Sequence, residues 1–184
     1  MPQSILERYA RSEDGKVIID VNAEKVEYLY DDFDKYSPYH KKDLDQGLAD
    51  YLVNSAIEIG KEDFIIKFRI EGGVDEGLKK RISSSVSGYF NYLSELEKRE
   101  LAKVFKSSSV LLMAGLVILT LSVKFNMGLG DGEGVLRTVV GEGLTIVAWI
   151  AMWESIALLL LNWIPIKKNI KVYDDLSGAD IVFA

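Results

Sequence analysis

Glu154 is the residue of this sequence that most needs a chemical explanation, because it is a carboxylate in the middle of an apolar stretch. The stretch, residues 144–166, reads LTIVAWIAMWESIALLLLNWIPI. Spanning a bilayer takes about 20 predominantly apolar residues, so this segment is long enough. A charged side chain at the bilayer centre costs about 2.5–3.5 kcal/mol on insertion scales. Such an acid must have a water-filled or protein-lined setting, or it must be protonated.

Three roles for Glu154 remain open. The residue lines a proton or cation path in an oligomer, since two spans per chain cannot enclose a pore. Alternatively, it is protonated and bonded within the hairpin, or it forms a contact between copies. In an antiparallel hairpin we expect it level with residues 115–119, near the hydroxyl of Thr120 or Ser122. The polar residues predicted inside the spans are Glu154, Thr120, Ser155 and Asn162.

Other chemistry finds little support in the sequence. The chain has no cysteine and a single histidine, His40, which excludes disulfides, thiolate sites and His-rich metal sites. The acidic cluster at residues 31–34 lacks the framework of a calcium-binding EF-hand. No phosphate-binding glycine motif and no nucleophile–base arrangement is recognisable. We therefore predict no enzyme, no cofactor and no metal, and the net charge of -6 disfavours a nucleic-acid partner.

The first 106 residues have the pattern of a small cytosolic α/β domain. Residues 17–21 (VIIDV) and 63–70 predict strands, and residues 43–59 predict a helix between them with Asp43 as its N-cap. Strand, helix and strand in this order indicate a crossover and a parallel pair. The predicted fold class is α/β (α+β), with a short, partly parallel three-stranded sheet, plus a two-helix transmembrane hairpin.

A long amphipathic helix, predicted for residues 74–106, ends this domain. Its apolar residues recur every three or four positions. They either belong to the core of the domain or contact another copy of the chain. Serines at 83–85 weaken its middle, where a kink or break is an option. The residues predicted for a contact between copies are Leu78, Ile82, Tyr89, Leu93 and Leu96.

Two apolar spans are predicted at residues 107–127 and 144–166, joined by an external connector at residues 128–143. Pro165 suits the exit of the second span. The tail, residues 167–184, holds a short helix at 171–176 and a strand, DIVF, that returns to the N-terminal sheet. The residues predicted to anchor the membrane interface are Trp163, Lys167 and Lys168.

Lysine and arginine distribution predicts the orientation. Four basic residues, from Lys98 to Lys106, precede the first span, and three, from Lys167 to Lys171, follow the second. The connector region has only Lys124 and Arg137. By the positive-inside rule, both termini are cytoplasmic in a multi-pass protein of the inner membrane.

The second span carries a family resemblance. Residues 149–153 read WIAMW, and residues 162–166 read NWIPI. This resembles a family of small, uncharacterised bacterial two-span membrane proteins, whose pattern is W-[VI]-A-x-W-R-P-x-E, then an aspartate and W-P-I. The residues that depart from the pattern are Glu154 for Arg, Ser155 for Pro, Ala157 for Glu and Asn162 for Asp. The resemblance implies the two-span topology with a cytosolic α/β domain, and it supplies no mechanism.

Two classes of function follow. In the first, the protein is a membrane-anchored module whose cytosolic domain binds an unknown cytosolic protein or ligand or assembles into a homo-oligomer. In the second, it is an oligomeric ion or proton channel that the cytosolic domain gates. Ion flux through proteoliposomes, compared between the wild type and Glu154→Gln, separates the two.

Overall fold

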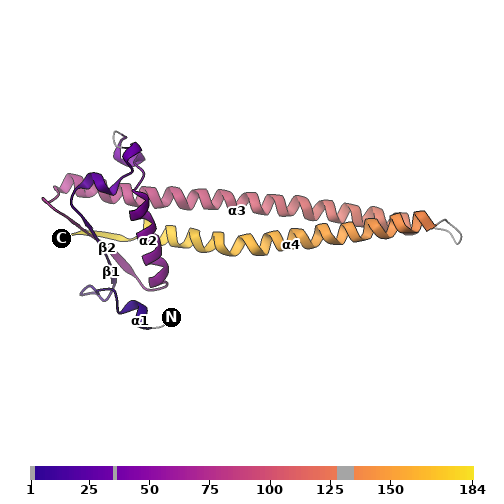
Figure 1. Ribbon diagram of the computed structural model, residues 1–184, viewed down its shortest axis with the longest axis horizontal. Helices are drawn as coiled ribbons and strands as arrows, with labels where there is room; N and C mark the ends of the chain where they lie inside the picture. The colour runs from indigo at the N-terminus through magenta and orange to yellow at the C-terminus, as the bar shows by residue number, and fades with distance from the viewer. Residues whose placement is uncertain (1–2, 35–36, 128–134) are drawn as a thin grey trace. The chain divides into compact units, whose positions relative to one another are not determined.

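The chain forms two compact units in a computed structural model, which describes residues 3–34, 37–127 and 135–184. Residues 1–96 and 169–184 make up the first unit, and residues 97–168 make up the second. Two long helices, α3 (Glu76–Met127) and α4 (Val135–Ser177), contribute residues to both units (Figure 1).

The first unit contains a three-stranded sheet in the order β1-β2-β3, and every pairing in it is parallel. β1 (Val17–Ala23) pairs with β2 (Phe64–Ile70) in register along their full lengths. β3 (Asp180–Phe183) pairs with residues 65–68 of β2. The three predicted strands are confirmed, but the sheet is wholly rather than partly parallel. A parallel pair needs a long crossover, which α2 supplies between β1 and β2, and α3 with α4 supply between β2 and β3.

The helix α2 (Gln46–Ile59) begins later than predicted. Its N-cap is Asp45, whose side chain accepts a hydrogen bond from the backbone N–H of Leu48. Asp43, the predicted cap, lies two residues before it, and its carbonyl accepts a hydrogen bond from the N–H of Asp31. Before α2 come the short helix α1 (Gln3–Leu6) and three 3-10 turns, η1 (Val26–Leu29), η2 (Asp32–Asp34) and η3 (Tyr39–Lys41).

The core of the first unit gathers alternate strand residues and one face of each helix. Ile19 of β1 and Phe68 of β2 have no exposed surface, and neither does Leu52 of α2. The Phe68 ring stacks on Phe183 of β3 with centroids 5.8 Å apart. Alternation of buried and exposed side chains is what a strand with one face on a core requires. Further buried residues of this core are Val17, Ile59, Ile66, Ile82, Val86, Phe90 and Leu176.

The long helices differ from the prediction in their ends and continuity. α3 runs without a break through residues 83–88, where a kink was predicted. α4 already includes residues 135–143, which were predicted as connector, and it continues through Pro165 into the tail that was predicted to hold a separate helix. Proline inside a helix removes one backbone hydrogen bond, which long apolar helices tolerate better than others. Residues 128–134 of the predicted connector lie outside the described residues.

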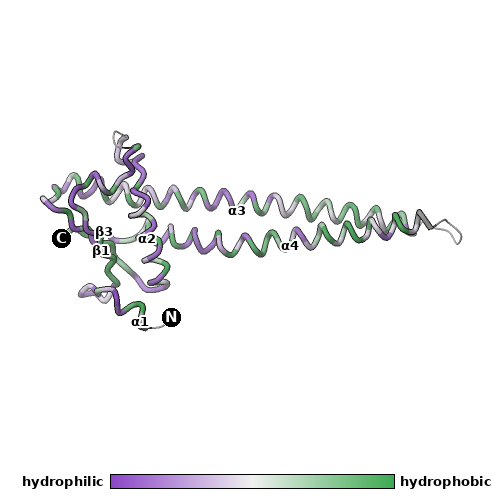
Figure 2. Tube along the Cα trace, viewed as in Figure 1, coloured by the Kyte–Doolittle hydropathy of each residue, from purple (hydrophilic) through white to green (hydrophobic). Residues whose placement is uncertain are grey.

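Hydropathy changes along each long helix. In Figure 2, α3 passes from mixed and hydrophilic residues to hydrophobic ones toward its C-terminal end, and α4 is hydrophobic first and hydrophilic last. Both helices are long and apolar enough to cross a membrane by length and composition, with only 11% of the most apolar window buried in each. A core helix of a soluble protein would be mostly buried, so these segments have apolar surface that nothing in the described chain covers.

Candidate functional site

Within residues 97–168, α3 and α4 meet along a line of small residues. On α3 these are Ser108, Gly115 and Ser122. On α4 they are Gly141, Ala148 and Ser155. All six are buried and each follows the last by seven residues. We call them the small-residue seam. Small residues let membrane helices approach closely, and a seven-residue repeat keeps one face on the partner helix.

Hydrogen bonds fix the register of this seam. The hydroxyl of Ser155 donates to the backbone oxygen of Ser108 at 2.6 Å. The hydroxyl of Ser122 donates to the backbone oxygen of Gly141 at 3.0 Å, and it lies 2.6 Å from the hydroxyl of Thr145. Hydrogen bonds between membrane helices contribute about 0.6 kcal/mol each on average. Polar contacts thus close both ends of a seam whose middle contains only apolar side chains.

The two helices come close together at Gly115. A Cβ atom there would lie 2.9 Å from Cγ of Met152 and 3.3 Å from the backbone oxygen of Ala148. Both distances are shorter than ordinary van der Waals contact, so the site has room for a hydrogen and for no larger group. A larger residue at this position would require the Met152 side chain to move and the α4 backbone to give way.

The seam places Glu154 at a different depth from the one predicted. Because Ser155 bonds Ser108, Glu154 lies within about one turn of Ser108, and Gly115 lies opposite Ala148 and Met152 instead. The predicted level, residues 115–119, was wrong by about six residues, or roughly 9 Å of helix. Glu154 is therefore nearer the lysine-flanked end of the hairpin than its central place in the apolar stretch suggests.

The four predicted intramembrane polar residues have different roles in the structure. Ser155 joins the helices across the seam. Thr120 and Asn162 instead donate to backbone oxygens of their own helices, at Leu116 and Leu158. Glu154 is exposed, and within the described parts of the chain it has no hydrogen-bond or ion-pair partner. The predicted contact between Glu154 and Thr120 is not formed.

Comparison with protein-family models, with curated proteins and with solved structures gives no match. The family resemblance of the second span consequently stays a prediction. Any function must be argued from the geometry of this chain itself.

The predicted interface anchors gather at the end of the apolar part of α4. The Nζ of Lys167 lies 5.0 Å from the ring centroid of Trp163, within the range of a cation–π contact. Lys168 follows and is exposed. A tryptophan with a basic neighbour after an apolar helix is the composition of a membrane interface.

The residues predicted for a contact between copies belong largely to the core of the first unit. Ile82 has no exposed surface, and Leu78, Tyr89 and Leu93 pack against the buried cluster. Leu96 is 41% exposed. Of the two roles left open for this stripe, the core role accounts for the first four residues, and Ile82 has no surface left for another copy.

Sequence reasoning missed the small-residue seam. Its signal was present in the seven-residue spacing of serine and glycine on α3, and of glycine, alanine and serine on α4. Ser122 and Ser155 were each considered as single polar residues, and their seven-residue spacing from the glycines and alanine was not used.

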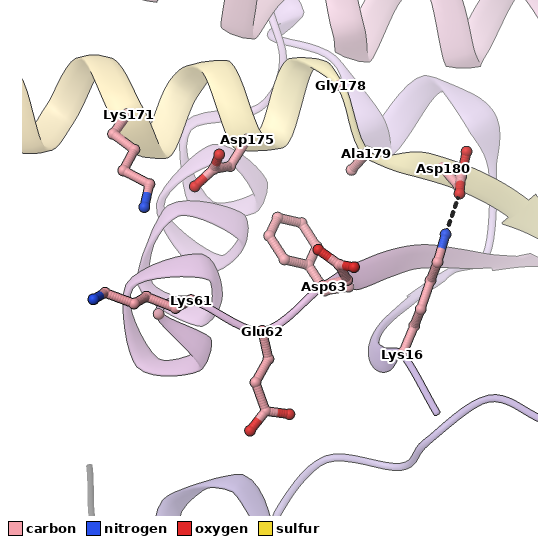
Figure 3. A pocket seen from close by; sticks show the side chains of 11 residues that line it. Lys16, Lys61, Glu62, Asp63, Lys171, Asp175, Gly178, Ala179 and Asp180 are labelled. Atoms are coloured by element: carbon pink, nitrogen blue, oxygen red, sulfur yellow. Dashed lines mark hydrogen bonds and ion pairs between the residues drawn. The ribbon is translucent and has the colours of Figure 1, made fainter. Parts of the chain in front are cut away.

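A charged cleft lies in the first unit, at the edge where the three strands begin (Figure 3). Its volume is about 330 Å³. Lys61, Lys171, Asp63 and Asp175 surround its middle, and the ion pair of Lys16 with Asp180, 2.7 Å long, closes one side. Three lysines and four carboxylates line this cleft, so it presents no dominant charge to a ligand. We assign it a structural role, in which the ion pair ties the start of β3 to the residue before β1.

The pH dependence of this ion pair can be tested. The hydrogen bond and charge of Asp180 raise the pKa of Lys16 above its ordinary value. When folding raises the pKa of a lysine, the protonated lysine stabilises the folded state. This contribution is complete below the pKa of the unfolded state, and it is lost as the pH rises through the pKa of the folded state. Lys16→Met should therefore lower the melting temperature of the first unit slightly at pH 8, and the difference from wild type should shrink as the pH rises past the ordinary lysine pKa of about 10.4. Lys61→Met is the matched control, because Lys61 lines the same cleft without a bond to Asp180. A difference that persists unchanged at high pH would contradict the assignment.

Proposed function

We propose that this protein is an integral membrane protein whose helical hairpin anchors a cytosolic α/β assembly module, in line with the family that its second span resembles. The observation that carries the proposal is the pair of long helices whose apolar parts, within residues 97–168, pack on each other along the small-residue seam. Their remaining apolar side chains are exposed, among them Val117 at 55% and Leu161 at 75%. Soluble proteins rarely expose contiguous apolar surface of this extent.

Three further features support the membrane setting. The seam relies on small residues and interhelical hydroxyl bonds, which are the usual contacts of helices in lipid. Trp163 with Lys167 fits an interface at one end of the hairpin. The basic residues before α3 becomes apolar, together with Lys167 and Lys168, favour a cytosolic position for both ends of the chain.

Alkaline extraction tests the anchor. We expect membranes from expressing cells to retain nearly all of the protein through carbonate at about pH 11 and through high salt, since an apolar hairpin is held by lipid rather than by charge. A matched variant with Val117→Arg and Ile150→Arg places charges on two exposed apolar positions and should be retained poorly. Release of the wild-type protein by carbonate would contradict the proposal.

The orientation is tested with single cysteines, which the chain lacks. Glu13→Cys lies in the first unit and Gly132→Cys in the connector region. In intact cells a membrane-impermeant maleimide should label Gly132→Cys and spare Glu13→Cys. The reverse labelling would place the termini outside.

The exposed Glu154 also supports a second candidate, an oligomeric ion or proton channel. Its carboxylate lies on an apolar helix surface without a partner in the described chain. If several hairpins enclose it in a common lumen, proteoliposomes should show ion flux that Glu154→Gln abolishes. Protein that is correctly inserted and shows no flux under any condition removes this candidate and leaves the anchored module.

A further inference from the structure

Each helix of the hairpin has an exposed stripe on the side away from the small-residue seam. The outer stripe of α3 consists of Lys106, Val110, Met113, Val117 and Lys124. The outer stripe of α4 consists of Ile150, Glu154, Leu161 and Ile164. Each member of the α3 stripe is two positions from a seam residue, which is about 200° around a helix of 3.6 residues per turn. On α4, Ile150 has the same offset from Ala148, whereas Glu154 is one position before Ser155, at the edge of the outer stripe.

The two outer stripes have opposite charges. The α3 stripe is bounded by Lys106 and Lys124. The α4 stripe contains the exposed Glu154. In the parts of the chain that the structure describes, none of these three side chains has an ion-pair partner. Apolar surfaces bearing unmatched charges are costly in a bilayer and are compensated by pairing.

The charges of Glu154 and Lys106 also match in depth. Ser108 bonds Ser155, which puts Lys106 within about one and a half turns of Glu154. Lysine bridges such a difference readily, because its long stem lies along apolar surface while its ammonium group reaches a polar partner.

From this complementarity we infer that the hairpins of neighbouring copies associate head to tail, with the outer stripe of α4 packed on the outer stripe of α3 of the next copy. The inference rests on the proposed membrane anchor and names the partner of its exposed surface, a second copy of this chain. Glu154 then meets Lys106 of the partner copy, and the apolar residues of the two stripes cover one another.

A symmetric contact is disfavoured by the same charges. Copies inserted in one orientation have identical residues at identical depth. A twofold contact of α4 with α4 would therefore set Glu154 against Glu154, and one of α3 with α3 would set Lys106 against Lys106. A contact between unlike faces repeats from copy to copy and gives a ring or an open array.

Engineered cysteines distinguish these arrangements, because the natural chain has none. Met113 and Ile150 lie on the two outer stripes at similar depth, since Gly115 faces Ala148 and Met152 across the seam. The double variant Met113→Cys/Ile150→Cys, treated in membranes with a short thiol cross-linker, should give a ladder extending beyond dimers. Each single variant should give no cross-linked species. Dimers from Ile150→Cys alone, or a double variant that stops at dimers, would overturn the head-to-tail arrangement.

Charge reversal tests the role of Glu154. In the cross-linking background, Glu154→Lys should lower the yield of the ladder by about tenfold, because it sets like charges at one depth. Adding Lys106→Glu should restore the yield to within about threefold of the parent, since the pair is then re-formed with reversed signs. Equal loss in the single and double reversal variants would overturn the pairing.

Failure of this inference is distinguishable from failure of the membrane anchor. The cross-linking uses only protein retained in membranes after alkaline extraction. As a positive control, Ser108→Cys/Ser155→Cys should cross-link within one chain, because these residues are bonded across the seam. Retained protein that forms the internal cross-link and no ladder overturns the inference and leaves the anchor intact, whereas protein lost on extraction removes both.

Discussion

Replacing Phe68 with alanine is expected to lower the free energy of unfolding of the α/β unit by about 3–5 kcal/mol, the cost of truncating a fully buried phenylalanine. Phe68 has no exposed surface and lies on the central strand β2, where its ring stacks on Phe183 at 5.8 Å. The substitution removes contacts with the core and also the ring on which the terminal strand β3 rests. Because β3 is only four residues long, we expect its pairing to be lost first.

The measurement is pulse proteolysis of the detergent-purified full chain over a series of urea concentrations. The wild-type midpoint should exceed that of Phe68→Ala by about 1 M or more, as urea slopes of 1–3 kcal/mol per molar imply. Phe33→Ala is the matched control: the same atoms are removed at a side chain that is 99% exposed, so the midpoint should hardly move. Equal shifts in the two variants would show that the sheet is not packed as described.

The sheet was predictable from sequence because its signals are local. The run VIIDV at residues 17–21 and the alternation of apolar and basic residues in β2 specify strands by themselves. The parallel pairing of β1 with β2 followed from the helix between them. The third strand was also predicted, since DIVF has no other sheet to join, although its direction was left open until the long crossover through α3 and α4 was known.

The N-cap of α2 could not be predicted from the local sequence. Asp43 and Asp45 are equally good N-cap residues by type. The structure uses Asp45, while the carbonyl of Asp43 accepts a hydrogen bond from the N–H of the distant Asp31. Pro165 is a similar case. As a rule proline ends a helix, and here α4 continues for twelve residues beyond it.

The depth of Glu154 was the largest error at the candidate site. The sequence shows two apolar segments joined by a connector. It does not show which residues of the two helices lie opposite one another. The register is set by contacts across the seam, in which Ser155 bonds Ser108 and Gly115 admits the backbone of α4. If α4 slid along α3 by one helical turn, the groups that bond across the seam would lose their partners, which costs free energy. The apolar pattern of one helix contains no information on this cost.

The seam itself gives the second large effect: Gly115→Leu should separate the two helices of the hairpin. A Cβ at this position meets the backbone oxygen of Ala148 and the backbone nitrogen of Met152, both at 3.3 Å. Backbone atoms cannot rotate away as a side chain does, so the helices must move apart. Overpacking of this kind costs about 1–3 kcal/mol, and the larger side chain favours the upper end.

Gly143→Leu is the matched control, because it makes the same change on α4 at a glycine whose Cβ would meet nothing within 4 Å. Both variants are placed in the Ser108→Cys/Ser155→Cys background, where the yield of the internal cross-link reports the closure of the seam. We expect Gly143→Leu to match the parent and Gly115→Leu to lose most of the cross-link, together with the thermal stability of the hairpin in detergent. If Gly115→Leu cross-links as well as the parent, small residues do not set the distance between α3 and α4. Because the depth of Glu154 is read from that same register, its pairing with Lys106 of a second copy would then lose its geometric basis.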